Sequence, residues 1–441
     1  MKLIWGTLIA AVMAVPAWAE IKIQQVQSPG GISAWLVQEP SIPFVSIEIM
    51  FEGGASLDLP GKRGATYLMT GLLEEGAADL DARGFAREVE ALAAQFSYDV
   101  SDDYVSVSAK FLTENRDQAV DLLRKSLIEP AFDEASIARV RAQVISGLRS
   151  DLTDPDEIVA RRFKEIALAG HPYGTAYEGT QDSVSSLTRD DLVTAHSNAL
   201  VRDRVYVGAA GDISAEDLSD LMDELLGDLP LATTPLPDRI DPVFDGGVTV
   251  VPFDTPQSVA QFGHIGIARD DPDFFPAYVL NVILGGGGFE ARLMTEVREK
   301  RGLTYGVYSY LVPKNSTALY LGRVASANDR IAEAIEVIRT EWERAATEGV
   351  TADELARAKT YLTGAYPLRF DGNGPIANIL VGMQTQDLSP EYIVTRNDSV
   401  NAVTLDDIKR VAARLLQPEN LSFVVVGQPV GLDSEDQPQD G

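Results

Sequence analysis

The hydrophobic pattern of the chain switches repeatedly between a period of two and a period of about 3.6. Residues 44–51 and 104–111 alternate apolar and polar side chains, which is the pattern of a half-buried β-strand. Residues 81–94, 116–127 and 331–347 repeat apolar side chains at helical spacing. Strands interleaved with long helices predict an α+β fold in which helices cover a mostly antiparallel sheet.

Part of this pattern occurs twice in the chain. A helix start at residues 187–192 (Leu-Thr-Arg-Asp-Asp-Leu) recurs at residues 403–408 (Val-Thr-Leu-Asp-Asp-Ile), 216 residues later. The apolar runs 205–211 and 421–427, each ending in Gly, are offset by the same 216 residues. A constant offset over so much sequence predicts a duplicated domain of about 200 residues.

A second repeated segment supports the duplication and sets the domain limits. Residues 132–139 match residues 350–357, and each segment opens a long helix. Between the copies, a Pro-rich stretch predicts an extended linker. The predicted organisation is a signal peptide at 1–19, a first domain at 20–228, a linker at 229–246, a second domain at 247–430 and a disordered acidic tail at 431–441.

The N-terminus and the composition predict an exported protein. A Lys at position 2, an apolar run over residues 3–15 and the ending Ala-Trp-Ala at 17–19 are typical of a secretory signal peptide. The sequence contains no Cys, hence no lipidation site and no disulfide. We therefore expect a periplasmic or secreted protein; an uncleaved anchor or a buried N-terminal strand is the alternative.

The charge and the remaining hydrophobic runs exclude two classes of partner. A net charge of −29 disfavours nucleic acid and anionic membrane surfaces. After residue 19, no apolar stretch approaches the ~20 residues that span a bilayer, so stable membrane insertion is not expected.

Residues 64–77 (Gly-Ala-Thr-Tyr-Leu-Met-Thr-Gly-Leu-Leu-Glu-Glu-Gly-Ala) resemble the active-site helix of the pitrilysin/insulinase family of zinc peptidases, in its mitochondrial-processing-peptidase-like branch. That helix carries His-x-x-Glu-His, in which two His bind zinc and Glu activates water. Tyr67, Thr70 and Gly71 stand at those three positions. The family's next ligand, a Glu on a later helix, falls near Ser146 or Gly147. The resemblance implies two homologous α/β sandwich domains arranged as a clamshell, with a degenerate zinc site.

The number and spacing of the histidines agree with the absence of a zinc site in this chain. The three His, at positions 171, 196 and 264, are scattered without a partner at helical spacing, whereas catalytic zinc usually takes three protein ligands. We expect these histidines to be structural. No cofactor is expected in this chain, and zinc is expected in a partner subunit.

Residues 281–308 resemble the second-domain signature of the same family. In that signature an Arg and a Tyr seven residues later reach substrate at the zinc, and Arg298 and Tyr305 fit this spacing. A Tyr hydroxyl can donate to the forming oxyanion, and a guanidinium can orient substrate carbonyls. Arg301 and Tyr308 share the spacing, and a purely structural role for either pair is the alternative.

Four consecutive glycines, Gly285, Gly286, Gly287 and Gly288, precede this signature. No Gly-Lys-Ser/Thr follows, so they do not form a phosphate-binding loop. The resemblance implies a tight loop at this turn. In the noncatalytic subunit of the mitochondrial processing peptidase a glycine-rich loop contacts substrate, so these glycines are candidate substrate-binding residues here.

These observations lead to one functional hypothesis and one alternative. The chain is expected to be the noncatalytic subunit of a heterodimeric periplasmic zinc metallopeptidase, inactive alone and paired with a homologue that carries His-x-x-Glu-His. It would close the chamber and present Arg298 and Tyr305 to peptide substrate at the partner's zinc. The alternative is a catalytically inactive peptide-binding or structural protein of the same fold, and a zinc peptidase with rearranged ligands is a third possibility.

Overall fold

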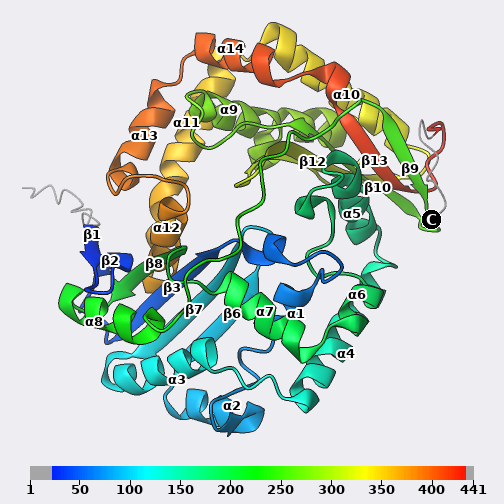
Figure 1. Cartoon of the computed structure of the whole chain (residues 1–441). Coiled ribbons are helices and arrows are strands. Elements are labelled where there is room, and N and C mark those ends of the chain that lie inside the picture. The colour runs from blue at the N-terminus through cyan, green and yellow to red at the C-terminus, as the bar shows by residue number, and fades with distance from the viewer. Residues whose placement is uncertain (1–21, 434–441) are drawn as a thin grey trace, which may run out of the picture.

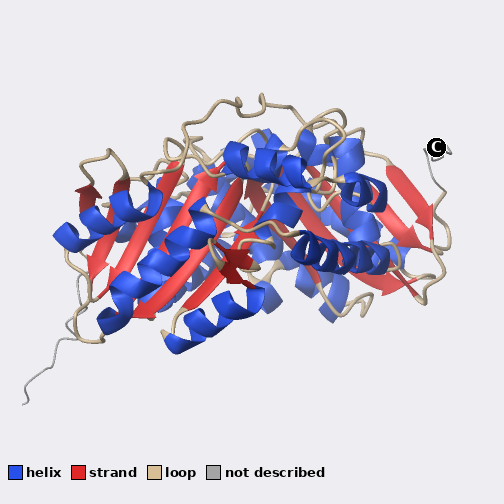
Figure 2. Cartoon of the chain, turned by 60° about the horizontal axis from the view of Figure 1, so that its bottom comes forward, coloured by secondary structure: helices blue, strands red, loops and turns tan. Residues whose placement is uncertain are grey.

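The computed structural model of the chain describes residues 22–433. The predicted signal peptide and all but three residues of the predicted tail lie outside the described residues. Two sheets dominate the structure, one built from each half of the chain (Figure 1). Figure 2 shows both sheets with helices packed along them.

The first sheet has six strands in the order β1-β2-β8-β3-β7-β6. Its strands are β1 (Gln24–Gln27), β2 (Ser33–Gln38), β3 (Phe44–Glu52), β6 (Gln95–Val100), β7 (Tyr104–Leu112) and β8 (Val205–Gly211). The predicted alternation is present in β3, where Val45, Ile47, Ile49 and Phe51 are fully buried. A separate small hairpin pairs β4 (Gly76–Ala77) with β5 (Leu80–Asp81).

The second sheet has five strands in the order β11-β12-β10-β13-β9. Its strands are β9 (Val248–Pro252), β10 (Gln257–Ile265), β11 (Val307–Pro313), β12 (Ala318–Ala327) and β13 (Ser422–Gly427). Read from β9, the sheet runs β9-β13-β10-β12-β11, which matches β2-β8-β3-β7-β6 strand by strand. In both sheets the first of these pairs is parallel and the others are antiparallel. The repeated sequence pattern therefore encodes a repeated topology.

Each half contributes its own set of α-helices. The first half contains α1 (Ala65–Thr70), α2 (Ala82–Ala91), α3 (Arg116–Ile128), α4 (Glu134–Asp151), α5 (Pro155–Ala167), α6 (Gln181–Ser186), α7 (Arg189–Ala199) and α8 (Ala215–Leu226). The second half contains α9 (Phe274–Asn281), α10 (Ile331–Glu348), α11 (Ala352–Ala365), α12 (Asn373–Gln384), α13 (Tyr392–Ala402) and α14 (Leu405–Leu415). The repeated Thr188 and Thr404 both cap their helices, each in a capping box with the Asp three residues later.

Short helical turns complete the chain. Two are π-helical, η4 (Val282–Gly286) and η6 (Met294–Glu299). The others are η1 (Gly54–Leu57), η2 (Thr113–Asn115), η3 (Pro172–Gly174), η5 (Gly288–Glu290), η7 (Tyr366–Phe370) and η8 (Pro418–Asn420). Residues 230–247, which include most of the predicted linker, contain no helix or strand.

One helix of each half is exchanged with the other half. Helix α12 lies against β8, β3 and β2 of the first sheet, while α5 lies against β13 and β10 of the second sheet (Figure 1). Phe163 of α5 and Leu380 of α12 are buried in these two contacts. The predicted first segment, residues 20–228, thus supplies a helix to the second sheet, and separating the two halves would expose both apolar contacts.

A buried ion pair network also joins the halves. Asp102, at the turn before β7, accepts hydrogen bonds from Arg63 at 2.9 Å and from Lys314 of the second half at 2.8 Å. Tyr104 donates to the side chain of Asn315, and Asn315 donates to Glu52. The contact surface between the halves is therefore both apolar and charge-paired.

None of the helices in residues 22–433 is long and apolar enough to cross a bilayer.

Candidate functional site

The start of α1 is fixed by one carboxylate and one glycine. Asp58 accepts hydrogen bonds from the backbone N–H of Gly64 and of Thr66, each at 2.8 Å, and from the Thr66 hydroxyl at 2.6 Å. Gly64 adopts a φ of 92°, and a Cβ there would lie 2.5 Å from the carbonyl oxygen of Glu178. These contacts position the short helix that carries the degenerate zinc motif.

The degenerate zinc positions line one cavity of about 480 Å³, which we call the first recess. Tyr67, Thr70 and Gly71 face it from α1, and Gly147 faces it from α4. Gly147 lines the recess and Ser146 does not. Of the two positions considered for the later zinc ligand, the structure therefore favours Gly147. Folding therefore brings Gly147 to the same cavity as Tyr67, Thr70 and Gly71, and none of the four is a His, Glu or Asp.

The residues of the first recess do not fit a zinc ion. The Thr70 hydroxyl donates to the carbonyl of Thr66 at 2.8 Å, and the Tyr67 ring packs near Tyr177 with ring centroids 5.9 Å apart. Two of the four positions are glycines. Across residues 22–433, no group of three His, Asp or Glu side chains is placed to hold a metal.

The three histidines have structural hydrogen bonds, in agreement with the sequence interpretation. His171 Nδ1 accepts from the backbone N–H of Tyr173 at 3.1 Å, and the ring of His196 lies 2.8 Å from the carbonyl of Leu127. His264 Nε2 accepts from the indole of Trp342 at 2.8 Å. Burial lowers the pKa of His264 to about 4, so this ring is neutral near pH 7.

The first recess carries strong negative charge that sequence reasoning missed. Its lining includes five carboxylates, those of Glu74, Glu75, Asp99, Asp151 and Glu178. Glu75 pairs with Arg139, but Glu74, Asp99 and Asp151 form no ion pair with any described residue. Burial and the neighbouring Glu75 raise the pKa of Glu74. Burial, Glu178, Asp151 and Asp99 raise the pKa of the Tyr67 hydroxyl, so it remains a hydrogen-bond donor at neutral pH.

In the second half, Arg298 and Tyr305 are not engaged in packing the domain. The Arg298 guanidinium lies 4.8 Å from the centroid of the Phe289 ring and forms no ion pair within the described part of the chain. Tyr305 is 88% exposed, and its hydroxyl has no hydrogen-bond partner among residues 22–433. The described contacts do not join Arg298 to Tyr305 or to the first recess.

The competing pair with the same spacing has structural roles. Arg301 donates to the carbonyl of Glu296 at 2.7 Å and pairs with its carboxylate at 2.9 Å. Tyr308 lies on β11 and stacks on Tyr310 at 6.0 Å. Arg301 is thus held by Glu296, whereas Arg298 has no such partner among the described residues, and Tyr305 is more exposed than Tyr308.

The glycine-rich segment is partly helical and not a simple loop. Gly285 and Gly286 close the π-helical turn η4, and Gly288 has a φ of 63°. A Cβ at Gly285 would lie 2.6 Å from the backbone nitrogen of Ser309, so β11 can pack here only against glycine. Gly287 and Phe289 border a second cavity.

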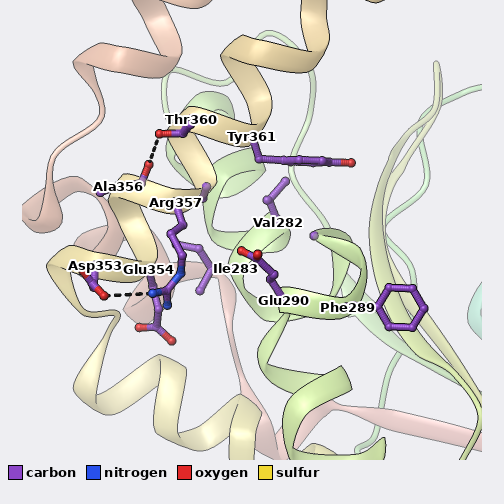
Figure 3. A pocket seen from close by; sticks show the side chains of 12 residues that line it. Val282, Ile283, Phe289, Glu290, Asp353, Glu354, Ala356, Arg357, Thr360 and Tyr361 are labelled. Carbon is purple, nitrogen blue, oxygen red and sulfur yellow. Dashed lines mark hydrogen bonds and ion pairs between the residues drawn. The ribbon is translucent and has the colours of Figure 1, made fainter. Parts of the chain in front are cut away.

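This second cavity, of about 700 Å³, is the counterpart of the first recess, and we call it the second recess. The first recess lies between α1 and α4, and the second recess lies between η4 and α11. The helices α4 and α11 both begin in the repeated sequence segment. Val140 and Gln143 line the first recess, and Ala358 and Tyr361, 218 residues later, line the second. Figure 3 shows Tyr361 projecting from α11 above Val282 and Glu290.

Comparisons with known proteins fit this geometry. Residues 34–181 match the model described as "Insulinase (Peptidase family M16)", and residues 186–362 match "Peptidase M16 inactive domain". The chain belongs to the insulinase family. It is a member whose sequence lacks His-x-x-Glu-His.

The relatives of this chain include a protein described as a non-peptidase and others described as proteases. It is 25% identical to "Non-peptidase homolog YmxG" of Helicobacter pylori, over 87% of this chain and 89% of the relative. It is 24% identical to "Uncharacterized zinc protease YmxG" of Bacillus subtilis, over 89% and 95%. It is also 24% identical to "Mitochondrial-processing peptidase subunit beta" of Saccharomyces cerevisiae, over 90% of each chain.

Solved structures share the fold of the whole chain. A crystal structure described as a peptidase M16 inactive domain from Pseudomonas fluorescens superposes with a TM-score of 0.87 at 26% identity, over 94% of this chain and 99% of that chain. A protease from Helicobacter pylori superposes with a TM-score of 0.83 at 18% identity, over 92% and 99%. The two-domain insulinase architecture implied by the sequence is confirmed.

Proposed function

We propose that this protein is the noncatalytic subunit of a heterodimeric zinc metallopeptidase. Its partner would be a homologue that carries His-x-x-Glu-His, and the pair would act on peptides in the periplasm. The observation that carries the proposal is the asymmetry between the two halves. The first recess is a cavity without zinc ligands, while Tyr305 is exposed and Arg298 forms no ion pair with the described residues.

In the proposed complex, this chain closes the chamber around the partner's zinc site. The Tyr305 hydroxyl would donate to the oxyanion that develops on the scissile carbonyl, and the Arg298 guanidinium would orient substrate carbonyls. The cation–π contact with Phe289 supports this role because it orients the guanidinium plane without using its N–H donors. No proton transfer is assigned to this chain.

The first test is purification of the tagged chain from its native host, followed by metal analysis and a peptidase assay. Co-elution of a homologue of similar size, with one zinc per pair and cleavage that a chelator abolishes, supports the proposal. A chain that elutes alone, free of zinc and inactive, contradicts it.

The second test separates catalytic contribution from assembly. We expect Tyr305→Phe to lower the kcat of the mixed complex by about 10² to 10³, because one oxyanion donor is lost. Tyr308→Phe is the matched control, since it removes the same hydroxyl from a neighbouring exposed tyrosine. Size-exclusion chromatography checks that both variants still assemble. Unchanged kcat in an assembled Tyr305→Phe complex would remove the role assigned to Tyr305.

One observation favours the alternative, an inactive peptide-binding protein. The first recess adjoins β6, which among the strands of residues 22–433 pairs with β7 alone and so forms an edge of its sheet. A peptide could add a strand there and place a basic side chain near Glu74, Asp99 and Asp151. Binding of a lysine-rich peptide by the isolated chain, weakened by salt and by Asp151→Asn, would support this alternative. Failure to bind it would count against it.

A further inference from the structure

A third cavity, of about 300 Å³, differs in charge from the rest of this acidic chain. It lies among α9, η7, α12 and α13, where α12 leaves the second half to cover the first sheet. Its charged lining residues are Arg269, Arg369 and Arg396, and no carboxylate lines it. We call it the arginine cavity. The chain contains 66 Asp and Glu against 37 Lys and Arg, so three arginines without an acid in one cavity require an explanation.

Arg396 is a buried cation whose partners are all neutral. Its side chain is only 4% exposed. It donates to the carbonyl of Leu362 at 2.8 Å, to the side chain of Asn397 at 2.9 Å and to the Tyr278 hydroxyl at 3.4 Å. It forms no ion pair with the described residues. Burial of a charge without a counter-ion is costly, and a bound anion would offset that cost.

Arg269 has hydrogen-bonding capacity that the protein does not use. Its guanidinium lies 4.3 Å from the centroid of the Phe274 ring and 5.2 Å from that of Tyr392. Its Nη2 is buried and has no hydrogen-bond partner among the described residues. Stacking holds the face of a guanidinium and leaves the N–H groups in its plane free for an acceptor.

Two carboxylates close to Arg269 in sequence are paired with other arginines. Asp271 and Asp273 both pair with Arg414, and Asp273 also pairs with Arg410. In this part of the fold, the guanidinium groups of Arg410 and Arg414 are thus neutralised by carboxylates of the protein. Neither Asp271 nor Asp273 lines the arginine cavity, so these carboxylates do not serve as counter-ions there.

We propose that the arginine cavity binds an oxyanion, either a phosphate or a carboxylate group. Arg269 and Arg396 hold the anion, and Arg369 stands at the exposed side. Guanidinium groups bind both kinds of oxyanion through paired N–H donors. Asn378 and Gln386 add amide groups to the lining. Because Asn378 and Met383 lie on α12, a bound anion would also stabilise the position of the exchanged helix.

The test is a titration of the purified full chain with two probes at constant ionic strength, inorganic phosphate and N-acetylglutamate. Isothermal calorimetry and thermal unfolding are expected to show saturable binding and stabilisation by at least one probe, with sodium chloride giving none. Tighter binding of phosphate indicates a phosphoryl group as the ligand. Tighter binding of N-acetylglutamate indicates a carboxylate.

Arg269→Gln should raise the Kd of the bound probe about tenfold or more, because a charge-assisted donor pair is lost. Arg83→Gln is the control: Arg83 lies exposed on α2, has no ion pair within the described residues and gives the same change in net charge. If Arg269→Gln does not fold, the exposed Arg369→Gln replaces it and should raise the Kd about threefold. No saturable response to either probe, or an equal Kd in wild type and the cavity variant, would overturn the proposal.

Discussion

The two recesses occupy equivalent positions in the two halves but differ in the charge of their linings. The first recess, between α1 and α4, is lined by five carboxylates and by the positions where the family places zinc ligands. The second recess, between η4 and α11, combines apolar residues such as Val282 and Phe289 with three carboxylates and one guanidinium, those of Glu290, Asp353, Glu354 and Arg357. Both halves keep the same strand order. The same backbone topology therefore carries different side chains in the two cavities.

The largest expected effect is a restored metal site in the first recess. We expect a variant with Tyr67→His, Gly71→His and Gly147→Glu to retain about one zinc per chain after dialysis, because three protein ligands then face one cavity. A Cβ at Gly147 meets no atom within 4 Å, so the new side chain has space. Metal analysis of the dialysed protein measures the outcome.

The matched control for this variant omits Gly147→Glu and should lose its zinc on dialysis. Adding Thr70→Glu alone to that control is not expected to create peptidase activity, since the third ligand is still missing. If the three-ligand variant folds and binds no zinc, the first recess has not kept the geometry of a metal site.

The next prediction compares the change in unfolding free energy when a glycine beside each recess is replaced by alanine. Gly285→Ala should cost about 2 to 3 kcal/mol of unfolding free energy, because the new Cβ would press against the backbone of Ser309. Gly71→Ala should change it by less than about 1 kcal/mol, because the new Cβ meets Val140 at 3.4 Å and φ is −67°. Chemical denaturation of both variants gives the difference. Equal costs would show that the second half is not packed more closely here than the first.

The smallest effect concerns acid sensitivity of the second recess. Burial alone would raise the pKa of Glu354, but hydrogen bonds from Arg292 and Thr351 and the charge of Arg292 lower it to about 2. The stabilisation from this carboxylate is therefore fully present above pH 4.5, where a glutamate in the unfolded chain is ionised, and is lost as pH falls toward 2. The difference in unfolding free energy between wild type and Glu354→Gln should shrink by on the order of 1 kcal/mol over that range.

Denaturation at a series of pH values checks this expectation. The control is Glu290→Gln, which removes a carboxylate from the same recess that has no ion pair among the described residues. A pH-independent difference for Glu354→Gln would mean that the Arg292–Glu354 pair does not depend on the carboxylate charge.

The features that could be predicted from the sequence are those that depend on residues close together in the chain. Alternation of apolar side chains predicted β3 and β7, and the repeated Thr188 and Thr404 predicted two helix starts. The repeat predicted two related sheets, and the absent zinc ligands followed directly from residue identity. These features are local because hydrogen bonding in caps and side-chain periodicity act over a few residues.

Only the tertiary structure decided which distant groups meet. The exchange of α5 and α12 rests on apolar contacts between halves, which no local period encodes. The unpaired carboxylates of Glu74, Asp99 and Asp151 come from three separate elements, and so do Arg269, Arg369 and Arg396. Charges at such separations interact only after packing has brought them together and removed water, and so the electrostatic character of the cavities is a property of the fold.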